Sequence, residues 1–132
     1  MRRLVYVSGP ISAPTVSEML ENIQRFAVAE NYLMRQGYAP INPAADAGAV
    51  ALGGITYEAC MERDVTLLRA VAAMDGANWQ LPGWQTSTGA MVEYHICRDL
   101  RVPCVEAEEG IARLHDVLRD DFVGALPDRP DD

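Results

Sequence analysis

Short β-rich runs alternate with longer helical patterns along the whole chain, and this alternation constrains the fold most. The helical patterns lie between Thr15 and Gly37 and at residues 57–73, 88–100 and 111–122, and the β-rich runs at residues 4–7, 38–41, 77–81 and 102–105. Such alternation predicts parallel strands with helices on both faces of one sheet. We therefore expect an α/β three-layer sandwich, Rossmann-like, with a parallel sheet of four to five strands. The length of the chain suits one domain. We expect this domain at residues 1–124, followed by a flexible acidic tail at residues 125–132.

Local signals support several of these boundaries. Thr15 stands three residues before Glu18, which is the spacing of a helix-starting capping box. Gly37 suits the position just after a helix. Residues 42–56 are rich in Ala and Gly without periodicity, so we expect a functional loop that selects the ligand.

The charge balance excludes several partners. Lys and Arg number 11 and Asp and Glu 19, which gives a net charge of −8. An acidic surface argues against nucleic-acid polymers and anionic membranes, although backbone N–H groups can still hold one phosphate. The three cysteines form no C-x-x-C pair, and the two histidines have no metal-ligand spacing. The N-terminus has too short an apolar run for a signal peptide or a membrane span. We expect a cytoplasmic protein without a metal.

Parallel sheets bind ligands beyond the carboxyl ends of their strands, which directs attention to residues 8–13, 42–56 and 82–89. In the last of these, Thr86, Ser87 and Thr88 precede a helix. Hydroxyls and unpaired N–H groups at a helix start suit a small anion, and Gly89 lets a ligand approach the backbone. The alternative interpretation is an ordinary helix N-cap.

Two acidic residues fall on apolar helix stripes. Glu93 shares a face with Ile96, Cys97 and Leu100, and Asp64 lies beside Met61 and Leu68. Two carboxyl groups facing one sheet edge suit glycosyl transfer, in which one attacks the sugar and the other protonates the leaving group. In the alternative, Glu93 lies at the edge of its stripe and reaches solvent or an arginine. We expect the neighbours of Asp64, Glu62 and Arg63, to face solvent.

Two aromatic residues lie near the same edge. The phenol of Tyr6 is suited to orienting a buried carboxylate, or it is a half-buried strand tyrosine. Trp84 is suited to stacking on a flat base, or it covers the core.

A set of short motifs resembles a known superfamily. In chain order they are Tyr6-Val7-Ser8-Gly9-Pro10-Ile11, Asn22, Phe26, Gly37-Tyr38, Asn42-Pro43, Glu62-Arg63-Asp64, Leu81-Pro82-Gly83-Trp84 and Ser87-x-Gly89-x-x-x-Glu93. Over residues 4–105 this pattern resembles the nucleoside 2-deoxyribosyltransferase-like superfamily, closest to a small branch frequent in phage genomes. It is also similar to the nucleoside 5′-monophosphate N-glycosidases.

The resemblance implies a flavodoxin-like fold, a homodimer or higher homo-oligomer, and cleavage of the base–sugar bond without a cofactor. By this resemblance Glu93 is the nucleophile, Asp64 the acid and Tyr6 the residue that positions the nucleophile. The implied substrate-binding residues are Ser8, Gly9, Pro10, Ile11, Asn42, Trp84, Ser87, Thr88 and Gly89.

Ser87 discriminates between two activities within the resemblance. Nucleoside transferases typically carry Asp at this position, whereas the monophosphate N-glycosidases carry Ser. An Asp would repel a 5′-phosphate, and a hydroxyl at a helix start would bind one. We therefore expect hydrolysis of (deoxy)ribonucleoside 5′-monophosphates. The alternatives are a nucleoside 2-deoxyribosyltransferase, a non-catalytic nucleotide-binding or sensing module, a phosphoribohydrolase of the lysine-decarboxylase-like type, and a flavin protein.

Overall fold

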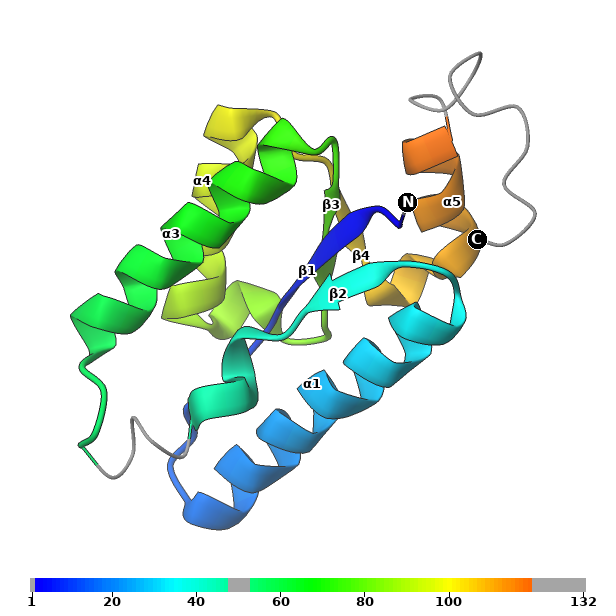
Figure 1. The fold of residues 1–132 in the computed structure, drawn as a ribbon. Helices are drawn as coiled ribbons and strands as arrows, with labels where there is room; N and C mark the ends of the chain where they lie inside the picture. The colour runs from blue at the N-terminus through cyan, green and yellow to red at the C-terminus, as the bar shows by residue number, and fades with distance from the viewer. Residues whose placement is uncertain (1, 48–52, 120–132) are drawn as a thin grey trace.

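Four parallel strands form one sheet in the order β2-β1-β3-β4. The strands are β1 (Leu4–Ser8), β2 (Ala39–Ile41), β3 (Ala77–Gln80) and β4 (Cys104–Glu106). They come from a computed structural model that describes residues 2–47 and 53–119 (Figure 1). From β2 the chain crosses back over β1 to form β3, so the strand order reverses between β1 and β3. This is the order of flavodoxin-like sheets.

Helices cover both faces of the sheet, which confirms the predicted three-layer α/β sandwich (Figure 1). One face carries α1 (Val16–Arg35) and α5 (Ile111–Arg119), and the other carries α3 (Tyr57–Ala73) and α4 (Thr88–Leu100). Single 3₁₀ turns follow three of the strands: η1 (Pro43–Asp46), η2 (Trp84–Thr86) and η3 (Ala107–Glu109). The predicted tail at residues 125–132, the end of the predicted last helix and residues 48–52 of the predicted loop lie outside the described residues.

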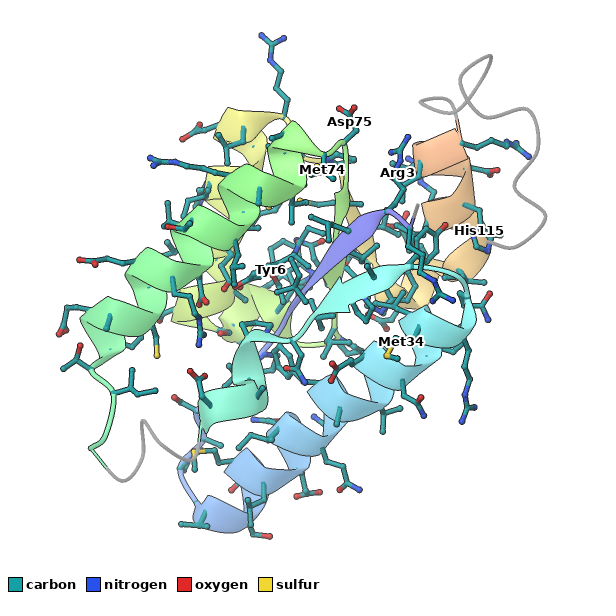
Figure 2. All side chains as sticks on the ribbon, viewed as in Figure 1. Arg3, Tyr6, Met34, Met74, Asp75 and His115 are labelled. Atoms are coloured by element: carbon teal, nitrogen blue, oxygen red, sulfur yellow. The ribbon has the colours of Figure 1, made fainter. Side chains whose placement is uncertain are left out.

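The alternation of side chains along β1 divides the core in two. Val5 and Val7 pack with the apolar residues of α1 and α5, whereas Tyr6 packs with Leu68 of α3 and Cys97 of α4. Successive strand residues point to opposite faces, so β1 serves both layers. Figure 2 shows Tyr6 on the side of β1 that faces α3.

The first helix begins and ends as its sequence predicts, but its apolar residues are not all buried. The Thr15 hydroxyl accepts the Glu18 N–H at 3.1 Å, and Gly37 has a φ of 95°. Phe26 and Leu33 are buried, whereas Leu20 is 57% exposed. The apolar positions of this helix therefore do not all face the core, because only one side of a long helix contacts the sheet.

Candidate functional site

A pocket of about 540 Å³ lies where the strand order reverses, beyond the carboxyl ends of β1 and β3. Asp64 and Glu93 both line it. So do the predicted binding residues after β1 and at the start of α4, which are Gly9, Pro10, Ile11, Ser87, Thr88 and Gly89. The carboxyl ends of parallel strands converge at one edge, which is why these distant segments meet.

Glu93 is buried in the second turn of α4 and receives two hydrogen bonds from β1. The Tyr6 phenol donates to Oε2 at 2.5 Å, and the Ser8 hydroxyl donates to Oε1 at 3.0 Å. Tyr6 and Ser8 are two residues apart on a strand, so both side chains point toward α4. They therefore lie beneath the pocket, behind the carboxyl group that they hold.

Asp64 is also buried, and a neighbouring arginine holds it. The guanidinium of Arg63 donates to Asp64 Oδ1 from Nε at 3.2 Å and from Nη2 at 3.0 Å. It also pairs with Asp46 and donates to the carbonyl of Pro43 at 3.2 Å, so it joins η1 to α3. The prediction that Arg63 faces solvent is thus only partly right, because its side chain is 37% exposed but its guanidinium turns back toward two carboxylates.

The pocket raises the pKa of both carboxyl groups. Burial raises the pKa of Glu93 to about 7; the hydrogen bond from Tyr6 opposes this rise and the charge of Asp64 adds to it. Burial likewise raises the pKa of Asp64, against the opposing effect of Arg63, and Asp64 also interacts with Tyr6 and Glu93. Burial and then the charge of Glu93 raise the pKa of the Tyr6 phenol, which stays protonated. Near neutral pH Glu93 is therefore present in both its protonated and its charged form.

The raised pKa of Glu93 has a consequence for stability. Glu93 has an ordinary pKa of 4.5, so the folded protein keeps a proton on Glu93 between about pH 4.5 and pH 7 that the unfolded chain loses. The free energy of unfolding should fall as the pH rises through this window. In Glu93→Gln we expect a smaller fall and a protein more stable than wild type above pH 7. Urea unfolding of both proteins at pH 5 and pH 8 measures this, and identical pH dependence would contradict it.

The start of α4 combines a helix cap with open space. The Ser87 hydroxyl oxygen accepts the Ala90 N–H at 3.2 Å, so Ser87 is the N-cap that the alternative interpretation predicted. Its hydroxyl hydrogen is not used in that bond and points to no fixed partner among the described residues. A Cβ atom on Gly89 would meet nothing within 4 Å, so the backbone there is open to the pocket. A residue that caps a helix leaves other N–H groups of the first turn unpaired, so this cap does not contradict the predicted anion site.

Two predicted binding residues have their side chains engaged away from the pocket. The Trp84 Nε1 donates to Glu106 at 3.1 Å, and the indole packs on Tyr94 with ring centroids 4.9 Å apart. The Asn42 side chain accepts the Ala44 N–H at 2.9 Å and donates to Glu30 at 3.0 Å. Neither residue is among the described residues that line the pocket. The structure thus does not bring the predicted base-stacking tryptophan to the carboxyl pair.

Sequence reasoning missed Asn78, which is wholly buried in β3. Its Nδ2 donates to the Ser8 hydroxyl oxygen at 2.7 Å and to the Tyr6 carbonyl at 3.0 Å. The sequence did carry a signal for it, because residues 74–80 are more polar than a buried central strand usually is. The partners of its amide nitrogen are the residues that hold Glu93, whereas its buried Oδ1 has no hydrogen-bond partner among the described residues.

Within residues 2–47 and 53–119, no three His, Cys, Asp or Glu side chains are grouped so that they could hold a metal ion. In the same ranges, no helix combines the length and apolarity that crossing a bilayer requires.

The fold and the site together define a parallel α/β protein with a paired-carboxyl pocket at the reversal of its strand order. The chain belongs to the family described as a domain of unknown function, DUF4406, which matches residues 3–106. That match runs through all four strands and contains the pocket-lining residues. No curated protein matches the chain.

Proposed function

We propose that the protein is an N-glycosidase that hydrolyses the base–sugar bond of (deoxy)ribonucleoside 5′-monophosphates. One observation carries the proposal. Two buried carboxyl groups face one pocket, and hydroxyls hold both oxygens of one of them, while a guanidinium holds the other group. A carboxyl pair in unlike surroundings is the arrangement that glycosyl transfer uses for a nucleophile and an acid.

The two residues have complementary parts in the reaction. A Glu93 oxygen attacks the anomeric carbon of the sugar, and the bond from that carbon to the base nitrogen breaks. Asp64 gives its proton to the departing base. Water then attacks the same carbon, Asp64 takes a proton from the water, and the ester bond to Glu93 breaks. The sugar phosphate leaves and both carboxyl groups return to their starting state.

The start of α4 supplies the proposed phosphate position. Ser87, Thr88 and Gly89 line the pocket on the same helix that carries Glu93 one turn later. The hydroxyls and the positive end of the helix dipole favour an anion there, whatever the net charge of the whole protein.

The charge at residue 87 should determine whether the protein prefers a nucleotide or a nucleoside as its substrate. In Ser87→Asp we expect kcat/KM for a nucleoside monophosphate to fall about a hundredfold, because a carboxylate would face the phosphate. Cleavage of the matching nucleoside should change little. Ser87→Asn is the matched control, since Asn and Asp cap helices equally well and only Asp adds a charge. Equal losses in both variants, or equal losses for both substrates, would contradict the phosphate position.

We also propose that the protein is a homodimer or higher homo-oligomer, as the resemblance implies. Helix α1 exposes several large apolar side chains, among them Val16, Leu20, Val28 and Met34. Such a surface favours association. Sedimentation of the whole chain measures its oligomeric state.

The proposed activity is tested by incubating the protein with a panel of nucleoside 5′-monophosphates and the matching nucleosides. We expect free base and a sugar phosphate. If base is released only when a second base is present and accepts the sugar, the protein is a transferase. Tight binding of a nucleotide with no release of base across the panel would contradict an enzyme and favour a nucleotide-binding module.

A further inference from the structure

We propose that Asn78, which lies behind the pocket, is a positioning residue for Glu93 and acts through Ser8 by fixing the direction of the hydrogen bond between them. The inference rests on the proposed function, since it assigns a residue to the support of the proposed nucleophile. Three linked groups then support the reaction. The buried Asn78 amide orients the buried Ser8 hydroxyl, and this hydroxyl orients the reacting carboxyl group of Glu93.

The orientation of the Asn78 amide follows from its partners. Asn78 pairs with Tyr6 in the parallel register of β1 and β3, and its Nδ2 lies 3.0 Å from the Tyr6 carbonyl oxygen. A backbone carbonyl only accepts hydrogen bonds, so the nitrogen of the amide must face it. The same nitrogen lies 2.7 Å from the Ser8 hydroxyl oxygen. Both amide hydrogens are therefore used.

The direction of the next bond follows in turn. The Ser8 oxygen receives a hydrogen from Asn78, and the single hydrogen of Ser8 is left for Glu93 Oε1 at 3.0 Å. Without Asn78 the Ser8 hydroxyl can rotate and accept instead of donate. The hydrogen bonds from Asn78 to Ser8 and from Ser8 to Glu93 thus keep a donor on one carboxylate oxygen. The Tyr6 phenol donates to the other oxygen. Two fixed donors hold the carboxyl plane and favour its charged form.

The groups that face Glu93 make a neutral substitution informative. The phenol of Tyr6 faces Glu93 from β1, and the carboxyl group of Asp64, which is paired with Arg63, faces it from α3. The thiol of Cys97 lies one turn further along α4. Asn78 carries no charge. Asn78→Leu keeps the shape of the side chain and removes only its hydrogen bonds, so any change at Glu93 does not come from an altered charge.

The test is a double-mutant cycle of Asn78→Leu, Ser8→Ala and the two together, with kcat and KM measured for a nucleoside monophosphate. We expect each single variant to lose about tenfold in kcat, as for one hydrogen bond to a charged group, with KM nearly unchanged. The double variant should be no slower than Ser8→Ala alone. Multiplied losses in the double variant would overturn the inference, because Asn78 would then act independently of Ser8.

A second readout separates this inference from the proposed function. The ¹³C shift of the Glu93 carboxyl carbon is titrated by NMR in the free wild-type protein and in the same variants. Asn78→Leu should raise the pKa of Glu93, and should raise it no further in the Ser8→Ala background. If wild type cleaves no nucleotide yet shows this coupling, the function fails and the inference stands. If wild type is active and the titration of Glu93 ignores Asn78, the inference fails and the function stands.

Asn78→Thr repeats both measurements if circular dichroism shows that Asn78→Leu does not fold. Its hydroxyl is one bond too short to reach Ser8, and its β-branched side chain suits a strand. The expected dependence on Ser8 is the same, and losses that ignore Ser8 would again overturn the inference.

Discussion

Replacement of Glu93 by Gln should slow the release of base at least about a thousandfold, because loss of a covalent nucleophile costs rates of this order. The amide has the shape of the carboxyl group but cannot form a stable glycosyl ester and depart again. The Tyr6 phenol can still donate to the amide oxygen and hold the side chain in place, with the amide nitrogen in the position of Oε1 beside Ser8. We therefore expect the affinity for the nucleotide to change little, whereas kcat should decrease by the factor given above. Single-turnover measurement of base release, alongside calorimetric binding, separates the two effects.

The matched control for this variant is Glu62→Gln. Glu62 is exposed on α3, so the same chemical change there should leave base release and binding as in wild type. The stability of Glu93→Gln provides a second control, since it should exceed that of wild type above pH 7. Release of base by Glu93→Gln at the wild-type rate would show that Glu93 is not the nucleophile.

Replacement of Asp64 by Asn should slow base release between about a hundredfold and ten-thousandfold, as expected for loss of a general acid. The loss should be smallest for substrates whose base departs readily without a proton. In wild type, kcat/KM should rise as Glu93 loses its proton near pH 7. In Asp64→Asn this rise should move to lower pH, because the charge of Asp64, which raises the pKa of Glu93, is gone.

Asp46→Asn distinguishes the acid from the ion pair around it. Both carboxylates bond Arg63, but the hydrogen bonds from Nε and Nη2 go to Asp64. Removing the Asp46 charge should leave the acid in place and cost much less activity. If Asp64→Asn and Asp46→Asn lose the same activity for every base, the role of Asp64 is to hold Arg63 and not to donate a proton.

The sequence predicted the architecture and the inward carboxyl groups because both depend on local periodicity. The helix expected at residues 57–73 has those bounds in the structure. Glu93 lies three and four residues before inward apolar positions, and it is 6% exposed as that spacing predicts. Alternation of strands and helices places their ends at one edge, which predicted the region of the pocket.

The missed and misplaced residues depend on contacts between distant segments. Arg63 turns back toward Asp46 on η1, and no helical spacing predicts where a long flexible side chain ends. Asn78 matters because β3 lies beside β1, a neighbour relationship across 72 residues. Trp84 follows a Pro-Gly turn near the pocket, yet its indole finds Tyr94 and Glu106 instead. Such contacts depend on strand order and on side-chain rotamers, and local periodicity predicts neither of these.

The proposed covalent bond between Glu93 and the sugar can be detected directly by mass spectrometry of wild-type protein quenched in acid during turnover of a nucleoside monophosphate. We expect a sugar phosphate attached to the peptide that contains Glu93, and none in Glu93→Gln. Release of base with no adduct at any quench time, or an adduct on another residue, would contradict the account.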